Sequence, residues 1–159
     1  MRVEKAGIAD IDALTELRLD YLAEDNGSLD YNDTEVIRNA LPGYFQDHLN
    51  RDLVAYVIRE DGIIVSCAFL LIVMKPMSPA FINGKTATVL NVFTRLSYRR
   101  KGYARMIMDD MIADAKEQGI SAVELKATEE GHNLYRSVGF EDDSSKYQLM
   151  KWKAAPETR

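Results

Sequence analysis

The feature that most constrains the fold is a pair of apolar runs in the middle of the chain. They cover residues 53–59 and 63–74, and both are rich in β-branched and aromatic residues. Asp61-Gly62 stands between them and is a strong signal for a tight hairpin turn. The two runs therefore predict an antiparallel hairpin.

Helical patterns precede this hairpin. Residues 3–5 could form a short strand, and apolar residues at helical spacing predict a helix over residues 8–24. Asp33 or Thr34 can cap a second helix that runs to Leu41. We expect Pro42-Gly43 to break or kink that helix before residues 44–49.

Strands and helices alternate after the hairpin. The patterns predict strands at 86–94, 122–127 and 146–152, helices at 102–116 and 133–138, and a frayed tail over 154–159. The order β-α-α-β-β-β-α-β-α-β predicts an α+β fold. Its mixed sheet would begin as an antiparallel meander, continue as β-α-β, and carry helices on both faces.

Composition limits the classes of function. The 159 residues fit a single domain, 1–159, and the net charge of −5 argues against nucleic acid as the main partner. The single cysteine, Cys67, excludes an intrachain disulfide framework and any cysteine-based metal cluster. With only two histidines, a catalytic metal site is improbable. The longest apolar stretch is too short for a membrane span, and the N-terminus does not resemble a signal peptide, so we expect a cytoplasmic protein.

A basic loop at the start of the predicted third helix is the best candidate for a ligand site. Four basic residues surround Gly102, namely Arg99, Arg100, Lys101 and Arg105. The first turn of a helix presents unpaired N–H groups and partial positive charge, and Gly102 and Ala104 leave room for close approach. The pattern fits a pyrophosphate cradle or a solvated basic helix start. It matches neither a P-loop nor a dinucleotide fingerprint.

Three segments carry a resemblance to a known family. Arg99-Arg100-Lys101-Gly102-Tyr103-Ala104 is similar to the [QR]-x-x-G-x-[GA] acetyl-CoA signature of the GNAT superfamily of N-acetyltransferases. Asn133-Leu134-Tyr135-Arg136-Ser137-Val138-Gly139-Phe140 resembles that family's LYxxxGF segment, and Leu90-Asn91-Val92-Phe93-Thr94 resembles its splayed strand. In element order the resemblance covers residues 3–152.

The resemblance implies an enzyme that transfers acetyl from acetyl-CoA, its cosubstrate, to a primary amine by direct attack on the thioester. It implies that backbone groups of Phe93 and Thr94 bind the acetyl carbonyl and the pantetheine amides. The pyrophosphate would be held by the backbone N–H groups of Arg100, Lys101, Gly102, Tyr103, Ala104 and Arg105. Arg99 would help to set the loop, and Asn133 and Tyr135 would lie beside the sulfur.

The chemistry needs a proton donor for the departing thiolate and an acceptor for the amine's proton. Tyr135 is the candidate acid. Many members of the resembled family carry a glutamate on the splayed strand, whereas residues 89–94 contain no carboxylate. Asn91 could orient a relaying water or make a hydrogen bond across the sheet, and the base stays unassigned. That gap leaves a second hypothesis open, an acetyl-CoA-binding regulatory or adaptor module with weak or lost catalysis.

The acceptor side is less well defined by the sequence. Glu129 is a remote candidate base, as are acidic residues between the first two helices, among them Glu24, Asp25 and Asp30. This acidic connection suits a cationic amine, on a small molecule or a peptide, or is only a solvated loop. Look-alike proteins commonly form dimers through their last strands, so a homodimer is a further possibility.

Overall fold

A five-stranded mixed sheet forms the centre of the computed structural model, which describes residues 1–155. The strands are β1 (Glu4–Lys5), β2 (Leu53–Glu60), β3 (Ile63–Met74), β4 (Lys85–Thr94) and β5 (Ala122–Glu124), in that spatial order. Pairing is antiparallel from β1 to β4 and parallel between β4 and β5. The predicted mixed sheet, with its meander followed by β-α-β, is confirmed.

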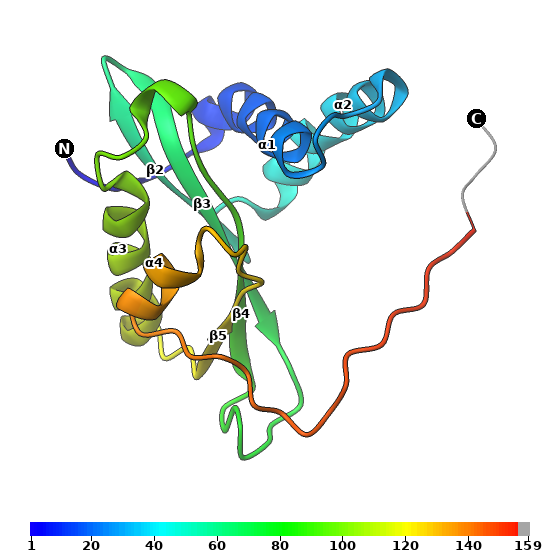
Figure 1. Cartoon of the computed structure of the whole chain (residues 1–159), viewed down its shortest axis with the longest axis vertical. Coiled ribbons are helices and arrows are strands. Elements are labelled where there is room, and N and C mark those ends of the chain that lie inside the picture. Colours follow the sequence, from blue (N-terminus) through cyan, green and yellow to red (C-terminus); the bar gives the residue numbers. More distant parts are fainter. Residues whose placement is uncertain (156–159) are drawn as a thin grey trace.

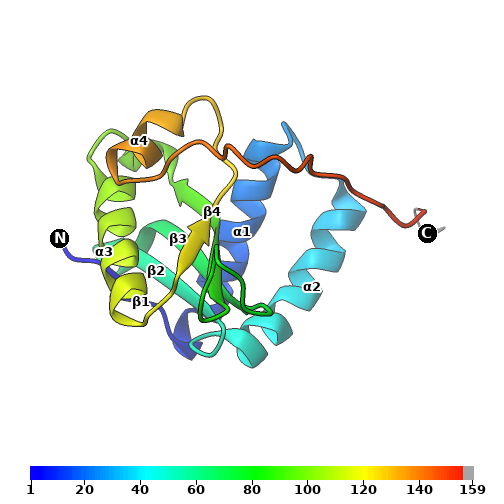
Figure 2. The same cartoon turned by 90° about the horizontal axis from the view of Figure 1, so that it is seen from below.

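Helices cover both faces of this sheet (Figures 1 and 2). On one face lie α1 (Ile11–Asp25) and α2 (Tyr31–His48), and on the other α3 (Tyr103–Glu117) and α4 (His132–Ser137). Short 3-10 turns, Ile8–Asp10 and Leu96–Tyr98, precede α1 and follow β4. The result is a layered α+β fold.

The central hairpin forms as the sequence predicts. Arg59 pairs with Ile64 and Glu60 with Ile63, so Asp61 and Gly62 alone form the loop. Both have positive φ, 51° and 78°. Two residues of this kind make a hairpin turn whose twist matches that of the flanking strands.

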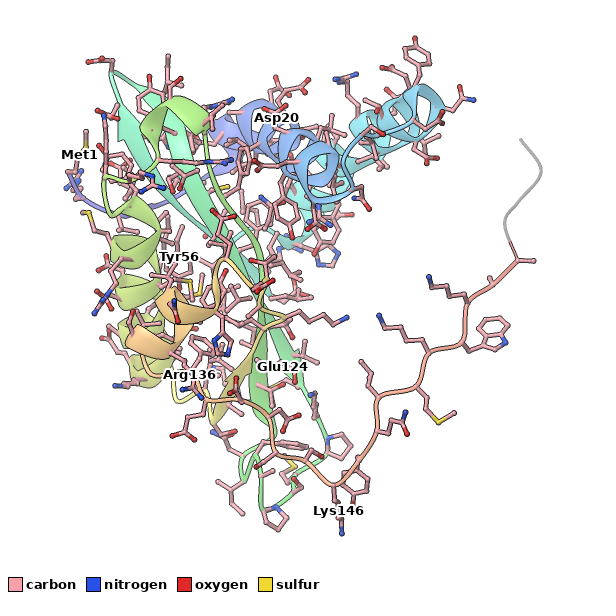
Figure 3. The ribbon with its side chains drawn as sticks, viewed as in Figure 1. Met1, Asp20, Tyr56, Glu124, Arg136 and Lys146 are labelled. Carbon is pink, nitrogen blue, oxygen red and sulfur yellow. The ribbon has the colours of Figure 1, made fainter. Side chains whose placement is uncertain are left out.

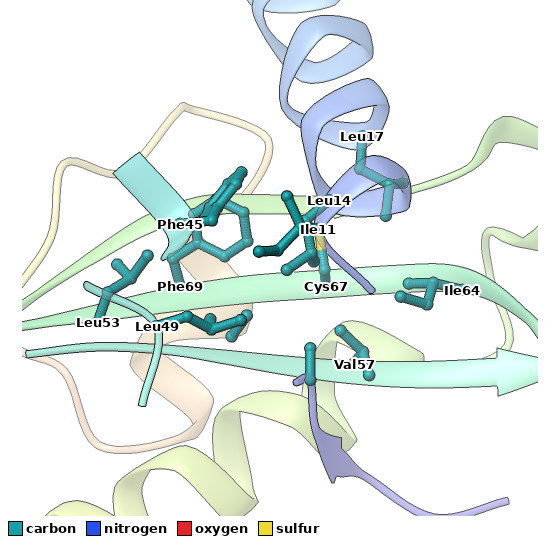
Figure 4. Close-up of a cluster of buried hydrophobic side chains, with 12 residues drawn as sticks. Ile11, Leu14, Leu17, Phe45, Leu49, Leu53, Val57, Ile64, Cys67 and Phe69 are labelled. Atoms are coloured by element: carbon teal, nitrogen blue, oxygen red, sulfur yellow. The ribbon is translucent and has the colours of Figure 1, made fainter. Parts of the chain in front are cut away.

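The core on the α1–α2 face is built from aliphatic and aromatic side chains (Figure 4). Phe45 is 1% exposed, packs edge-to-face on Phe69 with ring centroids 5.8 Å apart, and is the buried residue of α2. Leu14 and Leu17 bury α1 against the same cluster. Cys67 is fully buried there, and burial raises the pKa of its thiol to about 12, so it stays protonated at neutral pH.

The opposite face is covered mainly by α3. Ile107, Met108 and Met111 are fully buried against strands β2–β4. Tyr103, at the first turn, is also buried in this cluster. The start of α3 is therefore fixed firmly against the sheet.

Two predictions about element boundaries are wrong. The second helix does not break at Pro42-Gly43, because α2 runs through both residues. Proline removes one helical N–H, but Leu41 and Phe45 on either side pack on the core and hold the helix together. The strand predicted over 122–127 ends at Glu124, where its pairing with β4 ends.

The predicted last strand, 146–152, is also wrong. Residues 146–152 have no strand pairing and run away from the sheet (Figures 1 and 3). Their large side chains are exposed, with Trp152 at 88% and Met150 at 86%. Strand-forming residues need a hydrogen-bonded neighbour, and the adjoining edge strand, β5, is only three residues long. Part of the predicted frayed tail, from 156 on, lies outside the described residues.

Candidate active site

The separation of β4 from β5 is the central feature of the site. The parallel pairs are Thr86 with Ala122, Ala87 with Val123 and Thr88 with Glu124. Within residues 1–155, no pair joins the strands beyond that point, although β4 continues to Thr94. The second half of β4 therefore has backbone hydrogen-bonding groups on its β5 side that the sheet does not use.

A β-bulge at Asn91 lies within this unpaired half. Cys67 pairs with Phe93 but Phe69 pairs with Leu90, so β4 carries one extra residue. Asn91 occupies it with φ of 57°, a left-handed conformation that asparagine tolerates better than most residues. Its side chain is 2% exposed. The Oδ1 atom accepts a hydrogen bond from Arg18 (3.2 Å), and the Nδ2 group donates to Cys67 Sγ (3.5 Å).

At the end of β4 the backbone groups of Thr94 point into the gap, whereas those of its neighbours Phe93 and Arg95 face β3. The N–H of Arg95 donates to the carbonyl of Val65 in β3. Backbone groups of successive strand residues point to opposite sides, so those of Thr94 point away from β3. The Thr94 carbonyl accordingly accepts a hydrogen bond from Arg99 Nε (2.8 Å) rather than from a strand.

The N-terminus of α3 adjoins the same gap. Gly102 caps the helix with φ of 79°, and no side chain of the described part of the chain bonds to the helix start there. A Cβ at Gly102 would meet nothing within 4 Å, so the space in front of the first turn is open. Arg100 also has positive φ, 66°. Left-handed residues of this kind occur in anion-binding turns, and the first turn of the helix has N–H groups without a helical partner, so this region can accept an anion.

The basic side chains around Gly102 have different partners. Lys101 Nζ lies 3.4 Å from Glu60 Oε2, and Arg105 Nε lies 3.5 Å from Asp109 Oδ2. Arg100 is exposed. Tyr103 is buried in the core and Ala104 carries only a methyl group, so both can offer a ligand little besides their backbone.

Arg99 joins three elements. Besides its bond to Thr94, its Nη2 donates to Glu24 Oε2 at the end of α1 (2.8 Å), and its guanidinium lies 5.7 Å from the centroid of the Phe93 ring. The side chain thus ties the end of β4 to α1 and to the loop before α3. The role that the resemblance implies for Arg99, to help set the loop, stays a prediction.

Tyr135 lies on α4, on the other side of the gap. Its ring packs edge-to-face on Phe140, with centroids 6.1 Å apart. Burial raises the pKa of its phenol, and the nearby Tyr21 phenol raises it further. Tyr135 is therefore protonated at neutral pH, as an acid must be. Asn133, on the same short helix, is exposed.

Tyr21 is a site residue that sequence reasoning missed. It lies on α1, its ring packs edge-to-face on Phe93 at 6.4 Å, and it influences Tyr135 from across the gap. Arg18, one turn earlier, has its guanidinium 5.8 Å from the Tyr21 ring. A signal existed in the spacing, because residues 18, 21 and 25 share one helical face that is not apolar.

The carboxylates near the site are mostly engaged. Glu24 is bound by Arg99, Asp20 by Arg95 (3.3 Å), and Asp30 caps α2 by accepting from the Asp33 N–H. Asp25 lies close enough to Tyr21 to raise the pKa of that phenol, after burial. The described residues contain no cluster of three His, Cys, Asp or Glu side chains suited to a metal ion.

Comparison with known proteins identifies the family. The model of the acetyltransferase (GNAT) family matches residues 11–140, so this chain belongs to that family. Family membership indicates an acyltransferase. No curated protein matches the chain at the sequence level.

Solved structures share the fold. A predicted acetyltransferase from Clostridium acetobutylicum, solved with acetyl-CoA, is 27% identical, with a TM-score of 0.79 over 94% of this chain and 95% of that one. A GCN5-related N-acetyltransferase from Ralstonia eutropha JMP134 is 21% identical (TM-score 0.73; 94% and 97% covered). Glucosamine-6-phosphate N-acetyltransferase from Arabidopsis thaliana is 19% identical (TM-score 0.68; 95% and 97% covered).

The helices of residues 1–155 include none that is both long and apolar enough to span a membrane.

Gly131 offers a test of the position of Tyr135. A Cβ at Gly131 would lie 2.9 Å from Tyr135 Cε2, although the backbone there (φ −82°, ψ −14°) suits any residue. Gly131→Ala should therefore displace the phenol and lower kcat by about tenfold or more, with the Kd for acetyl-CoA nearly unchanged. Steady-state kinetics and calorimetry measure the two quantities.

Gly43→Ala is the matched control, because its Cβ would meet nothing within 4 Å and it lies within α2. It should leave kcat unchanged. Equal kcat values for Gly131→Ala and the parent protein would show that the position of the Tyr135 ring does not limit turnover.

Proposed function

We propose that this protein is an acetyl-CoA-dependent N-acetyltransferase that transfers acetyl to a primary amine by direct attack of the amine on the thioester. The observation that carries the proposal is the gap between β4 and β5, with the open start of α3 beside it. One extended ligand could occupy both features, with its amide groups along the unpaired half of β4 and its pyrophosphate at the start of α3.

In this proposal the pantetheine arm lies along the unpaired half of β4 and bonds to its backbone. The pyrophosphate sits on the N–H groups of residues 100–105, where the helix dipole and Gly102 favour an anion at close range. The relative from Clostridium acetobutylicum, whose structure contains acetyl-CoA, supports this choice of cosubstrate. We also propose that residues 1–159 act as a single domain.

The reaction forms a bond between the amine nitrogen and the acetyl carbon and breaks the bond from that carbon to sulfur. The tetrahedral intermediate carries an oxyanion, and the Thr94 N–H, which points into the gap, is the donor we assign to it. Tyr135 gives its phenolic proton to the departing thiolate.

In this proposal Asn91 has a structural role and does not orient a water. Both ends of its side-chain amide already have partners, Arg18 and Cys67. We assign Asn91 to holding the bulge that turns β4 away from β5. The amine's proton then leaves through water, with Asp25 of α1, which is close enough to Tyr21 to raise the pKa of that phenol, as the candidate acceptor.

The first test is the melting temperature with and without acetyl-CoA, compared with ATP and NAD at equal concentration. At about 100 times Kd, acetyl-CoA should stabilise the fold by about 2.7 kcal/mol, which raises Tm by about 5–10 °C in a domain of this size. Equal shifts with all three ligands, or none in a folded sample, would contradict the proposed site.

A second function remains a candidate because residues 89–94 carry no carboxylate and Glu24 and Asp20 are already paired. In that case the protein would bind acetyl-CoA as a regulatory or adaptor module. Release of free CoA thiol on addition of an amine supports the transferase. Acetyl-CoA binding without thiol release from any amine supports the module.

A further inference from the structure

Arg18 lies where α1, α2 and β4 meet. It donates one N–H to Asn91 Oδ1 at the bulge of β4 (3.2 Å) and lies 5.8 Å from the Tyr21 ring of α1. Burial raises the pKa of the phenols of Tyr21 and Tyr44, and the positive charge of Arg18 acts against both shifts, which places Tyr44 of α2 near it too. Arg18 thus stands beside the strand that faces the proposed thioester.

The charge of Arg18 has no carboxylate partner among residues 1–155. Its neighbours in the same layer differ: Arg38 binds Glu16 and Glu35, and Arg95 binds Asp20. Arg18 is nevertheless only partly exposed. A cation that is partly removed from water without a counter-charge is costly, and binding an anion would repay that cost.

The guanidinium also has unused donors. Arginine has five N–H groups in a planar fork that matches a carboxylate or a phosphate, and Asn91 takes one of them. The fork is held in place from one side by that bond and by the aromatic ring of Tyr21. A preorganised fork of this kind binds an anion with less loss of side-chain entropy than a free arginine would.

We propose that Arg18 binds an anionic group of the acceptor, so that the acetylated amine belongs to a molecule that also carries a carboxylate or a phosphate. This inference rests on the proposed acetyl transfer and names its substrate class. The amine would lie toward the gap, near Asp25 and Tyr21, and the anion toward Arg18. A single face of α1 would then bind both the amine and the anionic group of the acceptor.

The test measures CoA thiol release with acetyl-CoA and matched acceptors. One arm pairs each common amino acid with its α-amide, which keeps the amine and removes the negative charge. A second arm pairs glucosamine 6-phosphate with glucosamine, so the arms distinguish a carboxylate from a phosphate. Putrescine and spermidine serve as acceptors without an anion. We expect kcat/KM at least tenfold higher for the anionic member of one pair.

The variant arm uses Arg18→Gln and Arg18→Lys, with Arg38→Gln as the control, because Arg38 joins the same helix pair but is already paired. Arg18→Gln should lower kcat/KM about 10–100-fold for the anionic acceptor, mostly through KM, and change it less than threefold for the neutral partner. Arg18→Lys should keep part of the preference, and Arg38→Gln all of it. A purely structural role would affect both acceptors equally.

If Arg18→Gln does not fold because Asn91 has lost its hydrogen-bond donor, Arg18→Lys decides the question. Lysine lacks the planar fork of arginine and binds anions less specifically. An unchanged preference of Arg18→Lys for the anionic acceptor would contradict the proposed role of Arg18. If only amines without an anionic group are acetylated, the proposed role of Arg18 is wrong, but the proposed acetyl transfer is still supported. If acetyl-CoA raises Tm but no acceptor causes release of CoA, both the proposed acetyl transfer and the proposed role of Arg18 are contradicted.

Discussion

Tyr135→Phe should lower kcat by about 100-fold or more while acetyl-CoA binds as tightly as before. The substitution removes only the hydroxyl, and general acid catalysis of this kind typically contributes 10²–10⁴-fold. Burial and the Tyr21 phenol raise the pKa of Tyr135 above its usual value, so loss of its proton should not limit activity below about pH 10. The measurements are kcat for acetyl transfer across pH and the calorimetric Kd for acetyl-CoA.

Tyr147→Phe is the matched control, because Tyr147 is 77% exposed in the C-terminal segment that runs away from the sheet (Figure 1). It should behave as the parent protein does. Unchanged turnover in Tyr135→Phe would remove this residue from the mechanism. A large rise in the Kd for acetyl-CoA would instead make it a binding residue.

Phe45→Ala should reduce the free energy of unfolding by about 3–5 kcal/mol, the usual loss for a large aromatic side chain deleted from a core. The effect should be at the upper end because Phe45 is the buried residue of α2 and packs on Phe69 of β3. Urea denaturation followed by circular dichroism measures the change. Because α2 borders Arg18 through Tyr44, KM for the acceptor should rise in any folded fraction.

Val36→Ala on the same helix is the control, since Val36 is 56% exposed. It should change stability by less than about 0.5 kcal/mol. A loss below about 1 kcal/mol for Phe45→Ala would mean that α2 is not held on the sheet by this side chain.

The order of the elements could be predicted from the sequence because local patterns and sheet pairing agree over most of the chain. Residues 63–74 form the predicted strand, and Asp61-Gly62 forms the predicted turn. Local patterns fail where tertiary contacts decide the outcome. Pro42 lies inside α2 because packing on both sides outweighs one lost hydrogen bond, and residues 146–152 lack a partner strand despite a strand-like composition.

The candidate site also has parts that the sequence could predict and parts that only the fold shows. Gly102 and its basic neighbours are contiguous, so the sequence alone could suggest an anion site there. The gap between β4 and β5 is a relation between two strands, and only the register shows where pairing stops. Arg18, Tyr21 and Asn91 become neighbours only through the packing of α1 on β4, and no local pattern brings residues 73 positions apart together.

The unpaired half of β4 also bears on how such a protein can diverge. The groups it offers to a ligand are peptide groups, which every residue except proline supplies in full. A binding surface made of main chain places little demand on side-chain identity, so substitutions can accumulate along the strand while its spacing and direction persist. The solved structures named above share the fold of this chain at TM-scores of 0.68–0.79 while being 19–27% identical to it. In the proposed site, by contrast, preference for an acceptor would depend on side chains such as those of α1, and a new preference can arise there without any change to the strand.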